Sequence, residues 1–154
     1  MDVLLSGIRR KLPDIPITVI GANPPEPWAS YPPPGVLFTG FVPDLTPFYN
    51  RARLFVAPLR FGAGIKGKVL DSMANGLPVI ATPIAAEGIG ASDLVHIAIG
   101  KTDGDFLHKL TTAYTDENVW LRMQKNGKSL IKKNFSWEQA RRVVQYLLKR
   151  SAQQ

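Results

Sequence analysis

Short apolar runs recur along the chain and alternate with segments in which apolar residues are spaced as on one face of a helix. The runs have the length of buried strands and are bounded by proline, glycine or polar residues. They cover 17–21, 36–40, 54–58, 78–82 and 95–99. Continuous apolar strands separated by helices or long crossovers are typical of parallel sheets. The pattern therefore predicts an α/β fold: a three-layer, Rossmann-like parallel sheet with helices on both faces.

Helical spacing of apolar residues predicts the remaining elements. We expect helices over 2–12, 66–75, 103–115, 117–133 and 137–150. A further short helix is expected to be capped by Thr46. Asp103, Asp116 and Ser136 stand at N-cap positions, and Gln139 would complete a capping box with Ser136.

The length and composition are those of one globular domain, so we expect a single domain over 1–154. Of the 154 residues, 45% are hydrophobic, which is enough to form a core without disulfide bonds or a structural metal. Residues 22–34 contain six prolines and are expected to form a loop. The absence of cysteine excludes disulfides and thiolate metal sites. An acid precedes the first apolar run and a basic cluster follows it, the reverse of a secretory signal, so we expect a cytoplasmic location.

The chain is basic. Its 19 Lys and Arg residues against 12 Asp and Glu residues give a formal net charge of +7. Such a balance favours anionic partners, namely nucleotide phosphates, nucleic acid or acidic lipid. Much of the excess lies after residue 124 on helical faces without interleaved aromatic residues, which does not favour nucleic-acid binding. An anionic membrane surface, met by the full-length protein at the inner face of the membrane, is a candidate partner.

A glycine-rich stretch, RFGAGIKGKVLDSMANG (60–76), follows the predicted strand 54–58. Parallel sheets bind ligands at the carboxyl ends of their strands. Gly62 and Gly64 allow backbone amides to approach a ligand, and the start of the following helix attracts an anion. Lys66 and Lys68 add positive charge. Asp71, one turn further, could accept hydrogen bonds from sugar hydroxyls.

The same stretch allows two other interpretations. In the first, the glycines only form a turn, and Lys68 and Asp71 form a surface ion pair worth at most about 1 kcal/mol. In the second, Gly62, Gly67 and Lys68 belong to a P-loop. The next position of that motif needs a hydroxyl for magnesium, and Val69 has none. No predicted strand ends in the aspartate that a P-loop enzyme uses for the same ion.

Other catalytic groups are not apparent. His96 and His108 have no metal-ligand partner at close spacing, so both are expected to be structural or exposed. The sequence shows no Ser/His/Asp set and no pair of catalytic carboxylates. We therefore expect no metal site.

Residues 36–89 contain several motifs in succession. A strand ending in TGFV, a short helix with Tyr49 and a strand ending in AP precede the glycine-rich turn. An acid before SMANGLPVIAT and then AEGI follow it. In this order the motifs resemble the donor-binding half of retaining, GT-B-type glycosyltransferases of the bacterial group 1 family. The resemblance implies half of a GT-B fold and a hexosyltransferase that uses a nucleotide-diphosphate sugar, without a cofactor or bound metal.

The resemblance also implies roles for individual residues. Those expected to bind the donor are Gly40, Phe41, Val42, Gly62, Ala63, Gly64, Ile65, Lys66, Lys68 and Asp71. The turn and the helix start would hold the diphosphate. Asp71 matches the second acid of the family's Glu–seven residues–Glu motif, which contacts the ribose. Gly40, Phe41 and Val42 match the loop near the base.

The chain departs from the family pattern in three ways. Ala63 stands where the first acid of the motif belongs, and Glu87 is a candidate substitute in catalysis. Asp71 is one methylene shorter than the usual Glu. By the resemblance, we also expect the chain to begin inside the second of the family's two domains, without that domain's first strand and without the acceptor-binding N-terminal domain. The alternative function is a non-catalytic nucleotide-binding or interaction module of the same fold.

Overall fold

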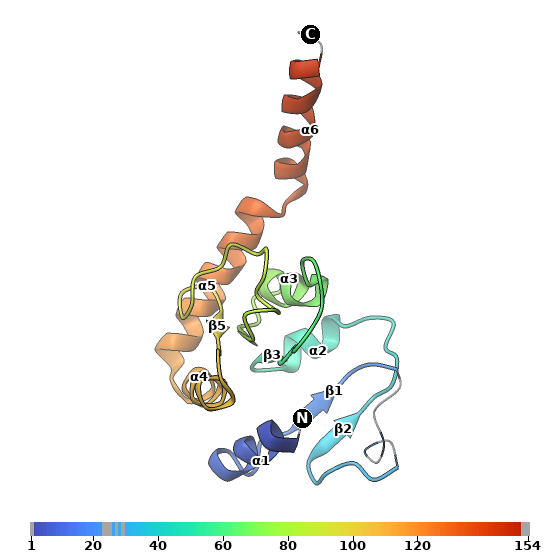
Figure 1. Ribbon diagram of the computed structural model, residues 1–154, viewed down its shortest axis with the longest axis vertical. Helices are drawn as coiled ribbons and strands as arrows, with labels where there is room; N and C mark the ends of the chain where they lie inside the picture. Colours follow the sequence, from blue (N-terminus) through green and yellow to red (C-terminus); the bar gives the residue numbers. More distant parts are fainter. Residues whose placement is uncertain (1, 23–25, 27, 29, 152–154) are drawn as a thin grey trace. The chain divides into compact units, whose positions relative to one another are not determined.

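All strand pairs are parallel, as the apolar runs predict. The structure, a computed structural model, describes residues 2–22, 26, 28 and 30–151 (Figure 1). The chain forms two compact units, residues 1–51 and 52–154, and each has its own parallel sheet. The predicted fold class, α/β with parallel sheets flanked by helices, is confirmed.

The first unit contains α1 (Asp2–Lys11), β1 (Ile17–Val19), β2 (Val36–Phe38) and α2 (Thr46–Arg51). Strands β1 and β2 pair in parallel, with Ile17 opposite Val36. The predicted loop at 22–34 lies partly outside the described residues. Its described residues belong to no helix or strand, and among them Trp28 packs edge-on against Phe38 with ring centroids 6.0 Å apart.

Arg9 of α1 holds the first unit together. Its guanidinium donates to the carbonyls of Pro13 and Ile15 at 3.0 and 2.6 Å, and of Pro34 and Gly35 at 3.2 and 2.8 Å. These carbonyls precede β1 and β2. One side chain therefore ties the end of α1 to the entry of both strands.

The second unit begins with β3 (Phe55–Ala57), α3 (Gly67–Ala74), β4 (Val79–Ala81) and β5 (Ala98–Ile99). Helices α4 (Asp103–Thr115), α5 (Glu117–Asn134) and α6 (Trp137–Ser151) follow. The sheet order is β3-β4-β5. All residues of β4 are fully buried. Because successive side chains of a strand point to opposite faces, both faces of this sheet are covered at β4.

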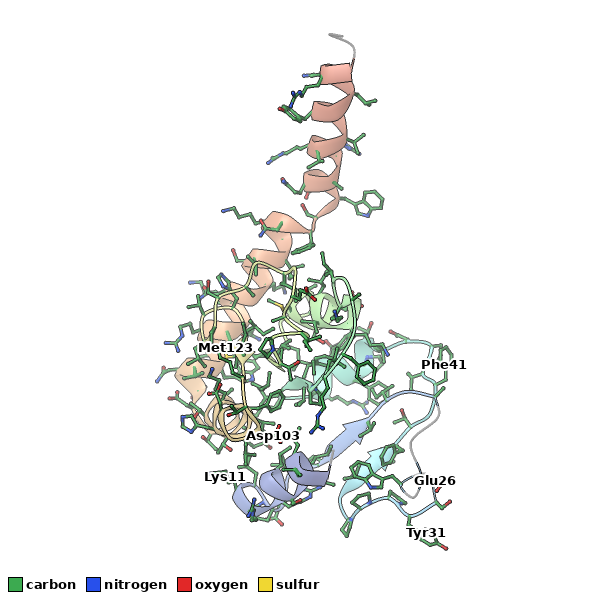
Figure 2. The ribbon with its side chains drawn as sticks, in the orientation of Figure 1. Lys11, Glu26, Tyr31, Phe41, Asp103 and Met123 are labelled. Carbon is green, nitrogen blue, oxygen red and sulfur yellow. The ribbon has the colours of Figure 1, made fainter. Side chains whose placement is uncertain are left out.

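The core of the second unit lies between the sheet, α3 and α5, which pack side by side (Figure 1). Val69 and Met73 of α3 are 1% and 2% exposed, as the helical spacing predicts. Met123 of α5 is fully buried (Figure 2). Full burial of each such side chain contributes roughly 1.5–3 kcal/mol. The glycine-rich loop is thus followed by a helix anchored in the core.

An aromatic stack joins the start of β3 to α4 and α5. The Arg53 guanidinium lies 5.6 Å from the ring centroids of both Tyr114 and Trp120. Arg53 Nε donates to the Tyr114 carbonyl, and Trp120 Nε1 donates to the Arg53 carbonyl, both at 2.7 Å.

Two predicted helix caps are confirmed. The Asp116 carboxylate accepts the N–H groups of Asn118 and Val119 at 2.9 and 3.2 Å, at the start of α5. The Ser136 hydroxyl accepts the N–H of Gln139 at 3.2 Å, at the start of α6. Among the described residues, no helix is both long and apolar enough to span a membrane.

Two other predicted caps are wrong by one or two residues. Thr102, in extended conformation, caps α4 by accepting the Asp105 N–H at 3.2 Å, and Asp103 is already helical. Thr46 is the first residue of α2, and its own N–H donates to Asp44 at 2.9 Å. At α4 the neighbours Thr102 and Asp103 are both good caps, and the backbone conformation decides between them. At α2 the Leu45 carbonyl already accepts the N–H groups of Phe48 and Tyr49, so Thr46 lies inside the helix.

Candidate functional site

The candidate site of the second unit lies where β3 and β4 end. Because β3 and β4 are parallel neighbours, with Ala57 opposite Ala81, the loops that follow them leave the sheet at the same edge. The Thr82 hydroxyl donates to the Leu59 carbonyl at 2.6 Å and accepts the Ala85 N–H at 3.3 Å. Thr82 therefore joins the bases of the two loops.

The glycine-rich turn has a backbone that requires glycine. Gly62 and Gly64 have φ of +137° and +72°, a region that residues with side chains rarely adopt. Lys66 Nζ donates to the carbonyl oxygens of both. In the described part of the chain, the N–H groups of Gly62, Ala63 and Gly64 have no hydrogen-bond partner. The carbonyls of Gly62 and Gly64 are thus occupied, whereas the donors of the turn are available to a ligand.

The N-terminus of α3 also presents free donors. Lys66, its N-cap residue, makes no side-chain cap. The N–H groups of Val69 and Leu70 bond to the Lys66 carbonyl, at 2.9 and 3.2 Å. Within residues 30–151 the N–H groups of Gly67 and Lys68 find no acceptor. Unpaired amides at the positive end of a helix dipole favour an anion.

Lys68 and Asp71 are both exposed on α3. The ion pair between them, which the structural interpretation of this stretch requires, is wrong: the described residues contain no such pair. Both side chains are therefore free to meet a ligand. Arg60, also exposed and without a hydrogen bond to any described residue, is a second free cation, placed before the turn. Sequence reasoning missed it, although its place directly before the glycines was visible.

The loop after β4 reaches the glycine-rich turn. A Cβ atom on Gly88 would lie 2.9 Å from Cγ1 of Ile65, so the Ile65 side chain packs directly on the Gly88 backbone. Glu87 precedes this contact and is exposed. The structure thus brings the AEGI motif to the turn predicted to hold the diphosphate.

The burial of Val69 argues against the P-loop interpretation. This side chain is 1% exposed and part of the core, so its position faces away from any ligand at the turn. The histidines fit the prediction that each is structural or exposed. His96 lies just before β5 rather than within it, and its Nδ1 accepts the Ser92 N–H at 3.0 Å, whereas His108 is exposed on α4.

The predicted base-binding loop belongs to the first unit. Gly40 has φ of +71°, and its carbonyl accepts the Gly21 N–H at 3.0 Å, so the loops after β1 and β2 are joined at the carboxyl ends of the strands. Phe41 is 78% exposed (Figure 2), and Val42 is half-buried. The donor-binding residues predicted from the sequence are therefore divided, with these three in the first unit and the others in the second.

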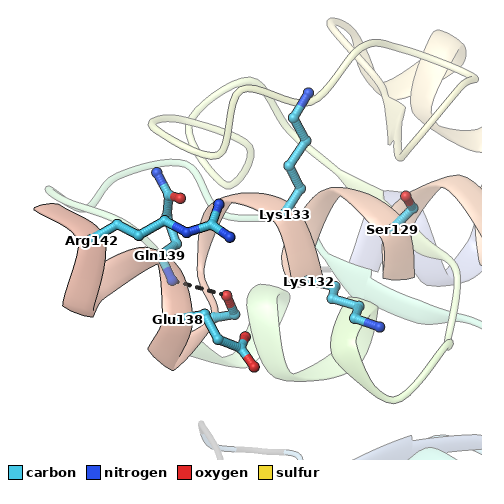
Figure 3. A pocket seen from close by; sticks show the side chains of 7 residues that line it. Ser129, Lys132, Lys133, Glu138, Gln139 and Arg142 are labelled. Carbon is cyan, nitrogen blue, oxygen red and sulfur yellow. Dashed lines mark hydrogen bonds between the residues drawn. The ribbon is translucent and has the colours of Figure 1, made fainter.

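A polar pocket of about 490 Å³ lies elsewhere, at the junction of α5 and α6 (Figure 3). It is lined by Ser129, Lys132, Lys133, Ser136, Glu138, Gln139 and Arg142. None of its lysine or arginine side chains is buried, and it shares no residue with the glycine-rich turn. Solvated charges without a buried polar partner do not form a preorganised binding site. The glycine-rich turn is therefore the better candidate for the ligand site. No cluster of potential metal ligands occurs among the described residues.

Comparison with known proteins gives the family. Residues 1–116 match the family model of group 1 glycosyl transferases. The chain is 32% identical over 114 residues to the lipopolysaccharide core biosynthesis mannosyltransferase LpsB of Rhizobium meliloti (strain 1021). That alignment covers 71% of this chain but only 32% of LpsB, so the chain spans about a third of this relative.

Solved structures share the fold. The C-terminal domain of the group 1 glycosyl transferase LpcC from Francisella tularensis has a TM-score of 0.73 at 20% identity, over 88% of this chain and 78% of that one. Anabaena HepE in complex with UDP has a TM-score of 0.80 at 13% identity, over 97% and 45% of the two chains. These similarities establish a GT-B glycosyltransferase domain fold. Together with the family match they show that the chain belongs to the group 1 family of glycosyltransferases.

Proposed function

We propose that this domain binds the nucleotide-diphosphate sugar donor of a retaining glycosyltransferase. The observation that carries the proposal is the set of unpaired amides at Gly62–Gly64 and at the start of α3, beside the free side chains of Lys68 and Asp71. Amides and a lysine suit a diphosphate, and a carboxylate one turn away suits sugar hydroxyls. Support also comes from HepE, which has the same fold and was solved with UDP and with UDP-glucose.

In the proposed reaction the bond between the sugar's anomeric carbon and the diphosphate breaks, and a bond to an acceptor oxygen forms on the same face. The acceptor hydroxyl passes its proton to the departing diphosphate oxygen, and the nucleoside diphosphate leaves with the electron pair of the broken bond. The glycine-rich turn, the α3 amides and Lys68 stabilise the charge that develops on the leaving group. Gly40, Phe41 and Val42 would serve the base, and an N-terminal acceptor domain would complete the site. No bound metal is required in this scheme.

Ala63 favours a second candidate function. The family's first motif acid is replaced there by a methyl group, which removes a contact to the donor sugar unless Glu87 supplies it. A chain that binds the nucleotide but does not recognise the sugar would be a non-catalytic nucleotide-binding or interaction module. Calorimetry with matched nucleoside diphosphates and nucleotide sugars distinguishes the two, because only a donor site gains affinity or selectivity from the sugar.

Asp71 provides the direct test of the proposed donor site. If its carboxylate accepts hydrogen bonds from the ribose, Asp71→Ala should weaken nucleotide binding by roughly 1.5–3 kcal/mol, the usual range for bonds to a charged group. The unliganded fold should change little, because Asp71 has no ion pair with any described residue to lose. Affinities are measured by calorimetry at one salt concentration, and unfolding by urea titration.

The matched control is Glu138→Ala, which removes an exposed carboxylate from α6. It should leave nucleotide affinity unchanged. Equal affinities of the wild type and Asp71→Ala would remove Asp71 from the site.

A further inference from the structure

The AEGI motif (residues 86–89) contacts the residue that follows the glycine-rich turn, and this contact has a consequence for the turn. We propose that Gly88 is a positioning residue: it leaves space for Ile65, and the resulting contact fixes the Gly62–Gly64 turn in the form that receives a diphosphate. The link to the diphosphate rests on the proposed function. The structural coupling between Gly88 and the turn can be tested without it.

The contact is too close for any side chain at position 88. A Cβ atom there would lie 2.9 Å from Cγ1 and 3.7 Å from Cδ1 of Ile65, whereas carbon atoms in contact are separated by roughly 3.5–4.0 Å. Cγ1 is bonded directly to Cβ, and β-branched side chains have few χ1 alternatives. Ile65 therefore cannot turn aside cheaply, and its backbone has to move.

Movement of Ile65 passes directly into the turn. Ile65 follows Gly64 and precedes Lys66, whose Nζ bonds to the carbonyls of Gly62 and Gly64. At the other end of the loop, the Thr82 hydroxyl holds the Leu59 carbonyl at 2.6 Å. The loops after β3 and β4 are thus joined at two points, by the Ile65–Gly88 contact and by the Thr82–Leu59 hydrogen bond. A displacement at Ile65 therefore cannot be relieved by moving the whole loop after β3 and has to distort the turn.

The contact also contributes little to the core. Ile65 is 49% exposed and is not part of the buried cluster of the second unit. A half-exposed isoleucine packed on a bare backbone has a larger effect on loop geometry than on global stability. This distinguishes positioning from a general structural role.

The test uses Gly88→Ala with Gly90→Ala as its matched control. Both glycines have positive φ, +76° and +69°, so alanine introduces similar backbone strain at each. Of the two, position 88 alone brings the new Cβ within 4 Å of another described residue beyond its chain neighbours. The first readout is the ¹⁵N–¹H spectrum of the ligand-free chain. Gly88→Ala should shift the amide signals of Gly62 and Gly64, and Gly90→Ala should leave them in place.

A compensating variant completes this test. Ile65→Ala removes Cγ1 and Cδ1, so adding Gly88→Ala to it should shift the Gly62 and Gly64 signals no further than Ile65→Ala alone. Identical spectra of the turn in Gly88→Ala and Gly90→Ala, or an equal additional shift in the Ile65→Ala background, would overturn the coupling.

The second readout is calorimetry with UDP, GDP and ADP. For the nucleotide that the wild type binds tightest, Gly88→Ala should lose about tenfold in affinity or more, about 1.4 kcal/mol, relative to Gly90→Ala. Equal affinities of these two variants would overturn the positioning role even if the spectra differ. If the wild type binds none of the three, the donor-binding function fails, and the spectra alone decide whether Gly88 fixes the turn.

Discussion

At the scale of single residues, two lysines of the same loop have different roles. Spacing places both Lys66 and Lys68 at the start of α3, and the sequence predicts only that both add positive charge. In the structure Lys66 Nζ holds the carbonyls of Gly62 and Gly64, whereas the Lys68 side chain is exposed and has no ion pair among the residues that the structure describes. The difference depends on the path of the turn, which residue spacing does not define. Lys66 thus shapes the turn, and Lys68 is available to the phosphates.

We predict that Lys68→Ala weakens nucleotide binding and also reduces its dependence on salt. An exposed lysine acts on phosphates through a field that salt screens, with a Debye length of about 8 Å at physiological ionic strength. Affinity is measured by calorimetry across a salt series. The control is Lys125→Ala, an exposed lysine of α5, which should alter neither the affinity nor its salt slope. An unchanged slope in Lys68→Ala would place this lysine away from the phosphates.

At the scale of elements, local patterns were sufficient to predict the helices and strands, but not the contacts that join them. The spacing of Val69 and Met73 predicted the buried face of α3, because helical periodicity is local. Lys109 shows the opposite case. Its Nζ donates to Asp93 at 2.7 Å, to Asp105 at 3.2 Å and to the Ile99 carbonyl at 2.6 Å, which joins α4 to the end of β5. Asp93 is 16 residues away in sequence, and no periodicity indicates such a pair.

This cluster makes stability depend on pH at both extremes. The hydrogen bond from the Lys101 backbone is the largest influence on Asp105 and, with Lys109, lowers its pKa below 3.8 despite some burial. Burial alone would lower the pKa of Lys109, but the hydrogen bonds and charges of Asp93 and Asp105 outweigh it and raise the pKa above 10.5. The Asp105 contribution is therefore lost as pH falls through its lowered pKa. The Lys109 contribution is lost as pH rises through its raised pKa.

We predict that Lys109→Met destabilises the fold by roughly 1–3 kcal/mol at neutral pH, because hydrogen bonds to charged groups are lost. It should also abolish the loss of stability above about pH 10.5, the ordinary range for lysine. Much of the acid-side loss should remain, since the Lys101 N–H still bonds to Asp105 at 2.9 Å. Urea unfolding across pH measures all three effects, with Lys125→Met as control. An alkaline loss as large as in the wild type would show that Lys109 is not its source.

At the scale of the whole molecule, the α/β class was predictable and the division of the strands was not. Apolar runs identify parallel strands, but they do not specify that β1 and β2 form one sheet and β3, β4 and β5 another. Strand pairing depends on which faces are buried together over long sequence distances. The same holds for the candidate site. The sequence RFGAGIKGK predicts the turn, but nothing in it predicts the contact of Ile65 with Gly88.

We predict that the 154-residue chain alone binds a nucleoside diphosphate weakly and transfers no sugar. It spans 32% of the mannosyltransferase LpsB, and the family resemblance implies that a separate domain holds the acceptor. Release of nucleoside diphosphate and glycosylation of added acceptors are assayed separately over a panel of nucleotide sugars. Transfer to any acceptor by the purified chain would show that its own residues complete the active site.

The aromatic stack on Arg53 has a practical consequence for measuring the unfolding of this chain by tryptophan fluorescence. Trp120 is held in the second unit by its bond to the Arg53 carbonyl, and Trp28 packs against Phe38 in the first. Trp137, 89% exposed, is the third of the chain's three tryptophans. Each unit therefore contains its own intrinsic fluorophore, and Trp137→Phe removes the solvent-facing background. Emission from the two remaining indoles then reports whether the units lose their structure together or in sequence.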